Sequence, residues 1–247
     1  MATKATISKK NERLLHTKSG NRCAICKTLL VDPDKPSLGC IGENAHIYGE
    51  KPDAARYDAS KDDTYVNSEA NLIFLCCNCH TKIDNDATLF PVERLFDLKS
   101  KHEQWVVEQL KQESVSYSFA ELEVLAKYLI TSATPMQSAT SYSLLKIDEK
   151  IKKNSLQSFQ MHITMGLSSN STIDDYLNKH PDPLFATQLT NIMAQKYQEL
   201  KAQDLDNDEI FSELWNFASG NRSDFSYKAA GLGILTYFFE KCEVFEK

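Results

Sequence analysis

The stretch Asn71-Leu-Ile-Phe-Leu-Cys-Cys-Asn-Cys-His80 joins a compact apolar run to a pair of cysteines in C-x-x-C spacing. A second such pair lies upstream, in Asn21-Arg-Cys-Ala-Ile-Cys26. Each pair can place two thiolates on one tight turn, and two such turns complete a tetrahedral zinc site with Zn–S bonds of ~2.3 Å. The sequence therefore predicts one structural Zn²⁺ and a small domain folded around it. The predicted ligands are the outer cysteines of the two pairs: Cys23, Cys26, Cys76 and Cys79.

The distribution of cysteines favours metal binding over disulfides. Six of the seven lie between Cys23 and Cys79, which is typical of a metal site in a reducing compartment. Cys40 and Cys77 are alternative ligands, although the outer four give both pairs the same geometry. His80 is a further alternative, in a Cys₃His site. For Cys40, Cys77 and Cys242 we favour the role of small buried hydrophobic residues.

A long insert separates the two cysteine pairs. Its 49 residues exceed what a simple zinc ribbon needs, so they contain further elements. Residues 45–49 are predicted as a short strand and residues 50–69 as a polar surface loop. The segment from His80 to Asp84 has helical character. The order along the chain is C-x-x-C, His46, Asn71 and C-x-x-C-His80.

This ordered pattern resembles the HNH endonucleases, whose active site is a ββα-metal fold, and the similarity covers roughly residues 5–110. The resemblance implies that His46 is the general base that activates water, a task that suits the near-neutral pKa of imidazole. It implies that Asn71 holds the histidine-bearing loop and that His80 binds a catalytic divalent cation. That cation, Mg²⁺ or Mn²⁺, stabilises charge on the phosphate and on the departing 3′ oxygen.

The predicted cation site has one further candidate ligand and lacks one ligand that is common in the family. Asp84 lies four residues after His80, so on a helix the two share one face and both can reach one cation. Many HNH endonucleases carry an acidic ligand directly before the first histidine, where this chain has Ala45. Glu43 and Asp84 are the candidates that compensate. The competing hypothesis is a zinc-containing nucleic-acid-binding or interaction module without catalytic activity.

The charge of the chain is unevenly distributed. Residues 1–112 carry 16 basic and 16 acidic residues, whereas residues 113–247 carry 12 and 18. A short helix is predicted over residues 8–18, with Ser8 as its N-cap. On this helix Lys9, Lys10 and Arg13 are predicted to contact the phosphates of double-stranded DNA; the alternative is a solvated helix face. The sequence leaves the choice between DNA and RNA open.

The sequence pattern of the rest of the chain predicts helices. Helices are predicted from Pro91 to near Gln112, over 119–130, and near 146–165, 184–202, 208–218 and 226–240. Residues 131–143 are rich in Ser, Thr and Ala and are predicted as a linker. The predicted fold class is α+β: a small zinc-stabilised ββα-metal nuclease domain followed by an all-α domain. The predicted boundaries are 1–112 for the nuclease domain, 113–141 for a helix and linker, and 142–247 for a helical oligomerisation or partner-binding domain.

A second resemblance concerns the helical half. The segments Lys146–Leu156, Asp208–Phe211 and Lys241–Lys247 resemble the C-terminal domain of effectors in ABC three-component systems, bacterial conflict systems of the Lamassu type. The resemblance implies an antiviral defence effector that assembles with an SMC-like ABC ATPase and a small third component. It also implies that the helical half restrains or oligomerises the nuclease until invading DNA is sensed.

Composition and hydropathy exclude two classes of protein. A hydrophobic fraction of 42% and a charged fraction of 25% are ordinary for globular chains and exclude wholesale disorder. No uncharged apolar run approaches the ~20 residues of a membrane span, and the first ten residues lack the apolar core of a signal peptide. We therefore expect a cytoplasmic protein without a membrane partner.

Overall fold

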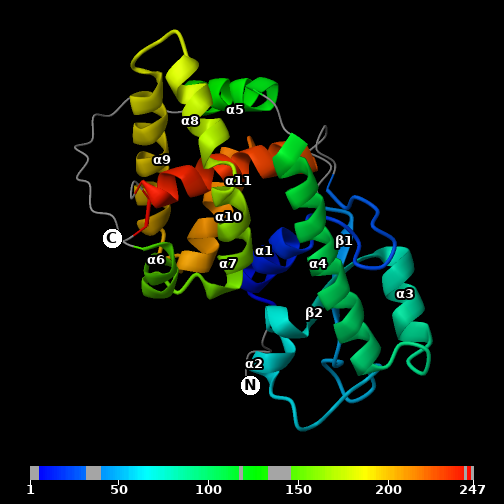
Figure 1. The fold of residues 1–247 in the computed structure, drawn as a ribbon. Coiled ribbons are helices and arrows are strands. Elements are labelled where there is room, and N and C mark those ends of the chain that lie inside the picture. Colours follow the sequence, from blue (N-terminus) through cyan, green and yellow to red (C-terminus); the bar gives the residue numbers. More distant parts are fainter. Residues whose placement is uncertain (1–5, 32–39, 117–118, 133–145, 242–243, 246–247) are drawn as a thin grey trace. The chain divides into compact units, whose positions relative to one another are not determined.

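The chain forms two compact units, Met1–Val106 and Val107–Lys247. The structure is a computed structural model that describes residues 6–31, 40–116, 119–132, 146–241 and 244–245 (Figure 1). The division falls inside helix α4 (Val92–Ser116). The domain boundaries derived from the sequence stay predictions, and residues 133–143, most of the predicted linker, lie outside the described residues.

The N-terminal unit is built around two antiparallel strands followed directly by a helix. Strand β1 (Gly42–His46) pairs with strand β2 (Leu72–Cys76), with His46 opposite Leu72 and Gly42 opposite Cys76. Helix α3 (Cys77–Asn85) begins at the next residue. Helix α1 (Lys9–Lys18) precedes this hairpin, and helix α2 (Asp63–Val66) and the 3-10 helix η2 (Glu69–Asn71) lie between its strands in sequence. This is the ββα order that the sequence predicts.

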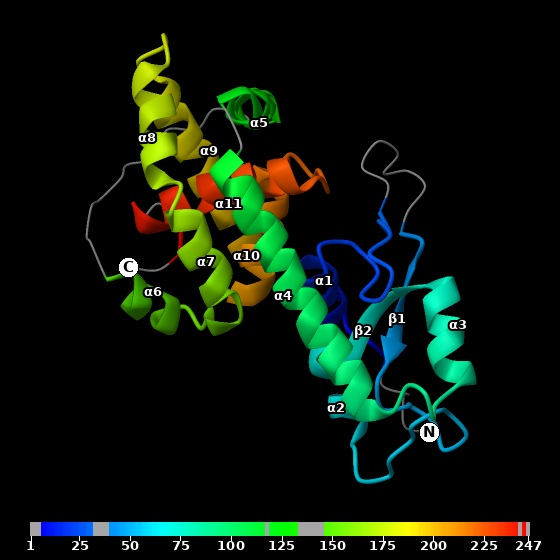
Figure 2. The ribbon, with the colours of Figure 1, turned by 45° about the vertical axis from the view of Figure 1, so that its right-hand side comes forward.

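Helices α1 and α3 cover opposite faces of the hairpin (Figure 2). On β1, Glu43 bonds to His80 of α3, whereas Asn44 bonds to His16 of α1. Since successive side chains of a strand alternate between faces, the odd-numbered residues of β1 point toward α3. The even-numbered residues, including His46 at the end of the strand, point toward α1.

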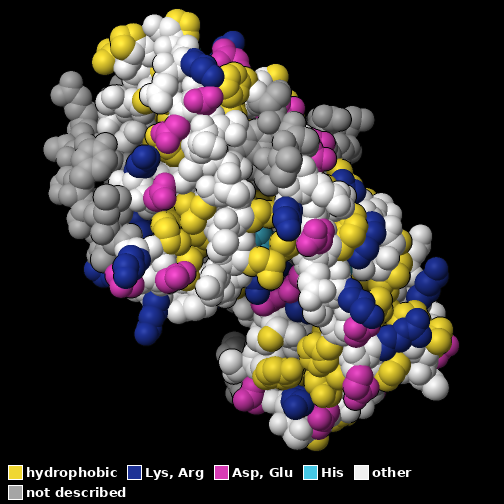
Figure 3. All heavy atoms as spheres, viewed as in Figure 1, with side chains coloured by type: hydrophobic (Ala, Val, Ile, Leu, Met, Phe, Trp, Pro, Cys, Tyr) yellow, Lys and Arg dark blue, Asp and Glu magenta, His cyan; other side chains and the backbone are white. Residues whose placement is uncertain are grey.

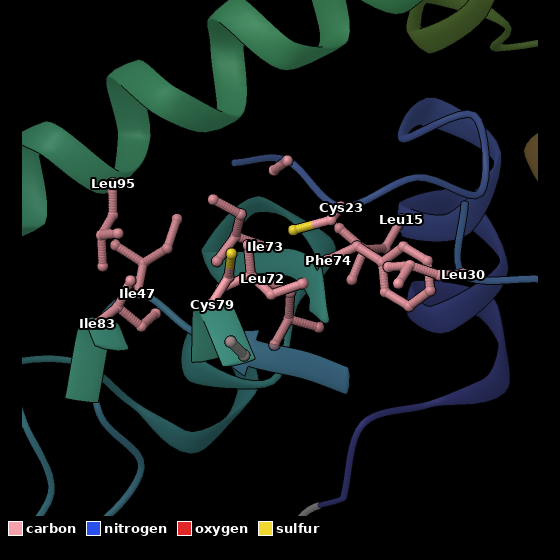
Figure 4. Packing of buried hydrophobic residues seen from close by; sticks show 13 residues of the cluster. Leu15, Cys23, Leu30, Ile47, Leu72, Ile73, Phe74, Cys79, Ile83 and Leu95 are labelled. Atoms are coloured by element: carbon pink, nitrogen blue, oxygen red, sulfur yellow. The ribbon is translucent and has the colours of Figure 1, made fainter. Parts of the chain in front are cut away.

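Strand β2 is buried on both faces, which explains its unbroken apolar sequence. Leu72, Ile73, Phe74 and Leu75 are each at most 1% exposed. They pack in one core with side chains from both flanking helices and from α4 (Figure 4). Two cysteines, Cys23 and Cys79, belong to the same core. The predicted zinc ligands are therefore continuous with the apolar packing of the unit.

The C-terminal unit contains no strand among its described residues. Its helices are α5 (Phe119–Ser132), α6 (Ile147–Lys153), α7 (Gln160–Leu167), α8 (Asn170–Lys179), α9 (Phe185–Lys201), α10 (Asn207–Ala218) and α11 (Phe225–Glu240), with the 3-10 helix η3 (Gln157–Phe159) before α7. Helix α11 packs against α5, α7, α8, α9 and α10, and ten of its residues are buried. A Cβ at Gly166 or Gly231 would overlap Thr236 or Ser219, so these glycines allow close helix approach. The predicted fold class is confirmed.

Several helix boundaries differ from the prediction. The helix expected near 146–165 is interrupted after α6, where Asn154 forms the C-cap and Ser155 has a φ of +54°. Helix α8 was not expected, and α4 continues to Ser116, past the predicted end near Gln112. None of the described helices is long and apolar enough to cross a lipid bilayer.

A buried lysine fastens the end of the C-terminal unit. Lys150 of α6 is 0% exposed, and its Nζ donates to the carbonyl oxygens of Phe239, at 2.7 Å, and Val244, at 2.8 Å. The same ammonium lies 4.5 Å from the centre of the Phe239 ring. It therefore caps the last turn of α11 and binds the backbone beyond it.

We expect Lys150→Met to lower the free energy of unfolding by ~2 kcal/mol, because two buried carbonyl groups lose their donor. Thermal denaturation of the full chain followed by circular dichroism measures the effect. Lys152→Met, at an exposed position of the same helix, is the control and should change the stability by less than ~0.5 kcal/mol. Equal melting temperatures for the two variants would contradict the capping role.

Candidate active site and metal centre

Four thiols meet at one end of the hairpin. The Sγ atoms of Cys23, Cys26, Cys76 and Cys79 all lie within 4.8 Å of one another, and those of Cys26 and Cys76 are 3.7 Å apart. The sulfurs of Cys23 and Cys79 point toward each other (Figure 4). A zinc ion with four ~2.3 Å bonds to sulfur requires S···S separations of ~3.8 Å. The four cysteines therefore fit a tetrahedral metal ion.

The thiols of this cluster differ in environment. Burial raises the pKa of the Cys23 and Cys79 thiols. Burial also acts to raise the pKa of Cys26, but hydrogen bonds from the Thr28 hydroxyl and backbone outweigh it and help lower that pKa to about 6. A metal ion bound by all four thiolates must displace protons from the two buried thiols.

Two further cysteines, Cys40 and Cys77, are not part of this cluster. The thiols of Cys40 and Cys77 are both exposed and neither belongs to the group of four. Their expected role as buried hydrophobic residues is therefore wrong, and Cys242 lies outside the described residues.

The first cysteine turn is fastened to helix α4. Lys27, which follows Cys26, has a φ of +64° and donates through Nζ to the carbonyl oxygen of Ala24. The same Nζ lies 2.8 Å from Nδ1 of His102, whose Nε2 lies 3.0 Å from the carbonyl oxygen of Ser19. Because an ammonium only donates, His102 accepts at Nδ1 and donates at Nε2. This chain of bonds links the turn to α1 and α4.

His80 lies between two carboxylates on the α3 side of the hairpin. Its Nδ1 is 2.6 Å from Oε2 of Glu43, and its Nε2 is 3.2 Å from Oδ2 of Asp84. A neutral imidazole has one N–H and can donate to only one of them. The other nitrogen–oxygen contact needs a proton or a cation between its atoms. This arrangement is the common one in which a metal-binding histidine donates its second N–H to a carboxylate.

The separation of His80 and Asp84 suits an octahedral cation. Adjacent ligand atoms around Mg²⁺ with ~2.1 Å bonds lie ~3.0 Å apart. The observed 3.2 Å between Nε2 and Oδ2 is close to that edge. His80 and Asp84 could therefore occupy two adjacent positions of one cation, and Glu43 would orient the imidazole from its far side. Ala45, at 1% exposure, supplies no ligand.

Arg56 is a residue of this site that the sequence did not reveal. Its side chain is 4% exposed and donates to Oδ1 of Asp84 at 2.8 Å. It also donates to the carbonyl oxygens of Ile47, at 3.0 Å, and Ile83, at 2.6 Å. Arg56 thus joins the segment after His46 to α3 and leaves the second oxygen of Asp84 facing His80.

Asn71 fixes the backbone that follows His46. The side chain is fully buried; its Oδ1 accepts from the N–H of Tyr48 at 2.9 Å. Its Nδ2 donates to the carbonyl oxygens of Tyr48 and Val66, and its own carbonyl accepts from the N–H of Ile47. These bonds hold the chain one and two residues beyond His46, in keeping with the role that the HNH resemblance implies.

The structure brings some of the expected site residues together and leaves others apart. His80 and Asp84 adjoin each other, whereas His46 is half-buried, and its Nε2 lies 3.4 Å from Oδ1 of Asn67. Within the described residues no hydrogen bond joins His46 to His80. His46 ends β1 on the face opposite Glu43, the residue of β1 that contacts His80.

The predicted DNA-contacting residues lie on α1. Lys9 and Lys10 are exposed and Arg13 is half-buried. Asn11, in the same turn, donates to the carbonyl oxygen of Asn67, the neighbour of His46. The first turn of α1 therefore lies on the His46 side of the hairpin. Figure 3 also shows basic side chains, interspersed with acidic ones, over α3 and α4.

Comparison with known families identifies both halves of the chain. Residues 23–90 match the family of HNH endonucleases, and residues 120–246 match C-terminal domain 10 of the ABC-three component (ABC-3C) systems. The second match spans slightly more than half of the chain. The chain belongs to this ABC-3C family. No curated protein matches it.

Both resemblances stated from the sequence are confirmed, and the ABC-3C protein is a fusion of the two domains. The HNH match spans the cysteine cluster and the segment from β1 through α3. The ABC-3C match begins at residue 120, so it includes all of α5 except its first residue, and the sequence prediction had grouped this helix with the linker. Systems of this kind have several components, so the ABC-3C domain implies partner proteins.

Proposed function

We propose that this ABC-3C protein is a metal-dependent endonuclease that hydrolyses DNA phosphodiester bonds and leaves 5′-phosphate and 3′-hydroxyl ends. The single observation that carries the proposal is the contact of His80 with Asp84 on α3, at the edge length of an octahedral cation site. Mg²⁺ or Mn²⁺ held there would stabilise the charge on the phosphate and on the departing oxygen. A structural Zn²⁺ on the four cysteines would fix β2 and α3 relative to the first cysteine turn.

Residues of the protein activate the water, orient the cation ligand and position the DNA. His46 accepts a proton from the attacking water, and the bonds of Asn71 keep the backbone beyond His46 in place. Glu43 orients the His80 ring through Nδ1, which leaves Nε2 for the cation. Lys9, Lys10 and Arg13 contact phosphates and position the duplex without reading its sequence.

A plasmid assay tests the endonuclease proposal. The purified full chain is incubated with supercoiled plasmid in Mg²⁺, Mn²⁺ or EDTA, alone and with its co-expressed partner proteins. We expect nicked or linear products with either cation and none in EDTA. Binding of DNA without metal-stimulated cleavage under both conditions would instead identify a zinc-containing binding module. Parallel incubation with structured RNA tests the alternative substrate.

The substitution Asp84→Asn tests whether Asp84 binds the catalytic cation. Loss of one carboxylate ligand should lower the rate of Mg²⁺-stimulated cleavage by ~10²-fold and raise the Mg²⁺ concentration needed for half-maximal rate. Asp97→Asn is the matched control, because Asp97 is exposed on α4 and pairs only with Lys101 among the described ion pairs. If both variants cleave at the wild-type rate, Asp84 is not a ligand of the cation.

We further propose that the ABC-3C domain assembles with an SMC-like ABC ATPase and a small third component in an antiphage complex of the Lamassu type. In this complex the domain restrains or oligomerises the nuclease until foreign DNA is sensed. A nuclease without sequence specificity would damage its host unless it were restrained. Co-purification from cells that express neighbouring genes, followed by mass measurement of the complex, tests the partners and the oligomeric state.

A further inference from the structure

We infer that Asn67 is a positioning residue that holds His46 with its proton on Nε2 and its lone pair on Nδ1. The catalytic meaning of this inference rests on the proposed function, whereas the assignment of the proton rests on the geometry alone. Asn67 is the C-cap of α2 and lies within residues 50–69, where the sequence predicted only a polar surface loop.

The orientation of the Asn67 amide follows from its second partner. Its Nδ2 lies 3.0 Å from the carbonyl oxygen of Asp63. A carbonyl oxygen only accepts, so the NH₂ end of the amide must face Asp63. The opposite end, Oδ1, therefore faces His46, and the flipped amide would bring two acceptors together at Asp63.

This orientation determines which nitrogen of His46 carries the proton. The Nε2 of His46 lies 3.4 Å from Oδ1 of Asn67, a separation longer than the ~2.7–3.2 Å of a strong hydrogen bond. Since an amide oxygen only accepts, Nε2 must be the donor. In a neutral ring Nδ1 then holds the lone pair. A general base needs that lone pair, and catalytic hydrogen bonds that are long in the free enzyme shorten when substrate binds.

Asn67 is itself held from several directions, as a positioning residue requires. It is 5% exposed, and its backbone N–H bonds to the carbonyl oxygen of Asp63 at 3.1 Å. Its carbonyl oxygen accepts from Nδ2 of Asn11 at 2.8 Å. The acceptor that faces His46 is thus fixed by α2 and by α1 rather than by a flexible loop.

Nuclear magnetic resonance of the ring nitrogens tests the assignment directly. The full chain is labelled with ¹⁵N-histidine and recorded at a pH where the imidazoles are neutral, and His46→Gln identifies the signals of His46. We expect the wild type to carry the proton on Nε2. In Asn67→Leu, which removes the acceptor but keeps the size, the ratio of the Nε2–H to the Nδ1–H form should fall ~5-fold, the factor that one ordinary hydrogen bond supplies.

Asn67→Asp is the comparison variant, because it keeps an acceptor oxygen toward His46, although its second carboxylate oxygen replaces the Nδ2 donor that faces the carbonyl oxygen of Asp63. Its tautomer ratio should stay at the wild-type value or exceed it. In the plasmid assay kcat should fall ~10-fold in Asn67→Leu with KM unchanged, and Asn67→Asp should recover most of that loss. Zinc content and circular dichroism establish that both variants are folded.

The outcomes separate this inference from the proposed function. A wild-type His46 that carries its proton on Nδ1, or a tautomer ratio unchanged in Asn67→Leu, overturns the role of Asn67 even if the protein cleaves DNA. The expected shift in tautomer supports that role even if no cleavage is found, and the endonuclease proposal alone then fails.

Discussion

Cys79→Ser is expected to remove the bound zinc and to unfold the HNH endonuclease domain at temperatures where the wild type is folded. Cys79 lies in the apolar core and in the cysteine cluster at the same time, so its loss affects both. In small zinc domains the apparent free energy of zinc binding is ~10–16 kcal/mol, and this energy stabilises the folded state because only the folded chain forms the complete site. We expect a loss of at least ~3 kcal/mol, which lowers the melting temperature of a domain of this size by at least ~12 °C.

Cys77→Ser is the matched control for this change. Cys77 lies on the same first turn of α3, but its thiol is exposed and outside the group of four. It should retain one zinc per chain, measured by inductively coupled plasma mass spectrometry, and the wild-type melting temperature. A strong chelator should reproduce the effect of Cys79→Ser on the wild type. Zinc loss in both serine variants, or in neither, would contradict the assignment of the outer four cysteines.

The ordered cysteines, His46, Asn71 and His80 carry the resemblance to the HNH endonucleases, and that resemblance implies the ββα order that the structure has. From the residues themselves only an apolar run before the second cysteine pair and helical character after it could be predicted, and these became β2 and α3. The exact strand was harder to predict. The apolar and aromatic residues at 45–49 predict a strand there, yet β1 spans Gly42–His46. Ile47 and Tyr48 bond instead to the main chain and side chain of Asn71, so tertiary contacts outweigh strand propensity here.

Other features of the site depend on partners far apart in sequence. Arg56 and Asn67 both lie in a predominantly polar stretch, and its local pattern does not distinguish them from solvated residues. The guanidinium of Arg56 is buried only because carbonyl groups after β1 and at the end of α3 meet there. The sequence offers Glu43 as a substitute for the acidic ligand missing at Ala45, but its contact with Nδ1 of His80 depends on the strand register, which the sequence does not show.

His46→Ala should lower the rate of metal-stimulated plasmid cleavage by ~10³-fold, because general bases contribute ~10²–10⁴-fold to catalysis. The variant should keep its zinc and its melting temperature. His46 is half-buried at the end of β1, and its ring makes one long hydrogen bond, so little folding energy depends on it. The rate of nicking at saturating Mn²⁺ is the measurement, and a DNA-binding assay should show affinity close to that of the wild type.

Asn44→Ala is the matched control, since Asn44 lies on the same face of β1 and bonds to residues of α1 rather than to the proposed site. A folded Asn44→Ala variant should cleave at nearly the wild-type rate. The comparison tests the geometry of the proposed site. In that site the base, His46, lies on the α1 side of the strand, and the phosphate is held by His80 and Asp84 on the α3 side. If His46→Ala and Asn44→Ala cleave equally fast, the water is activated by a group on the α3 side, and Glu43 becomes the residue to replace next.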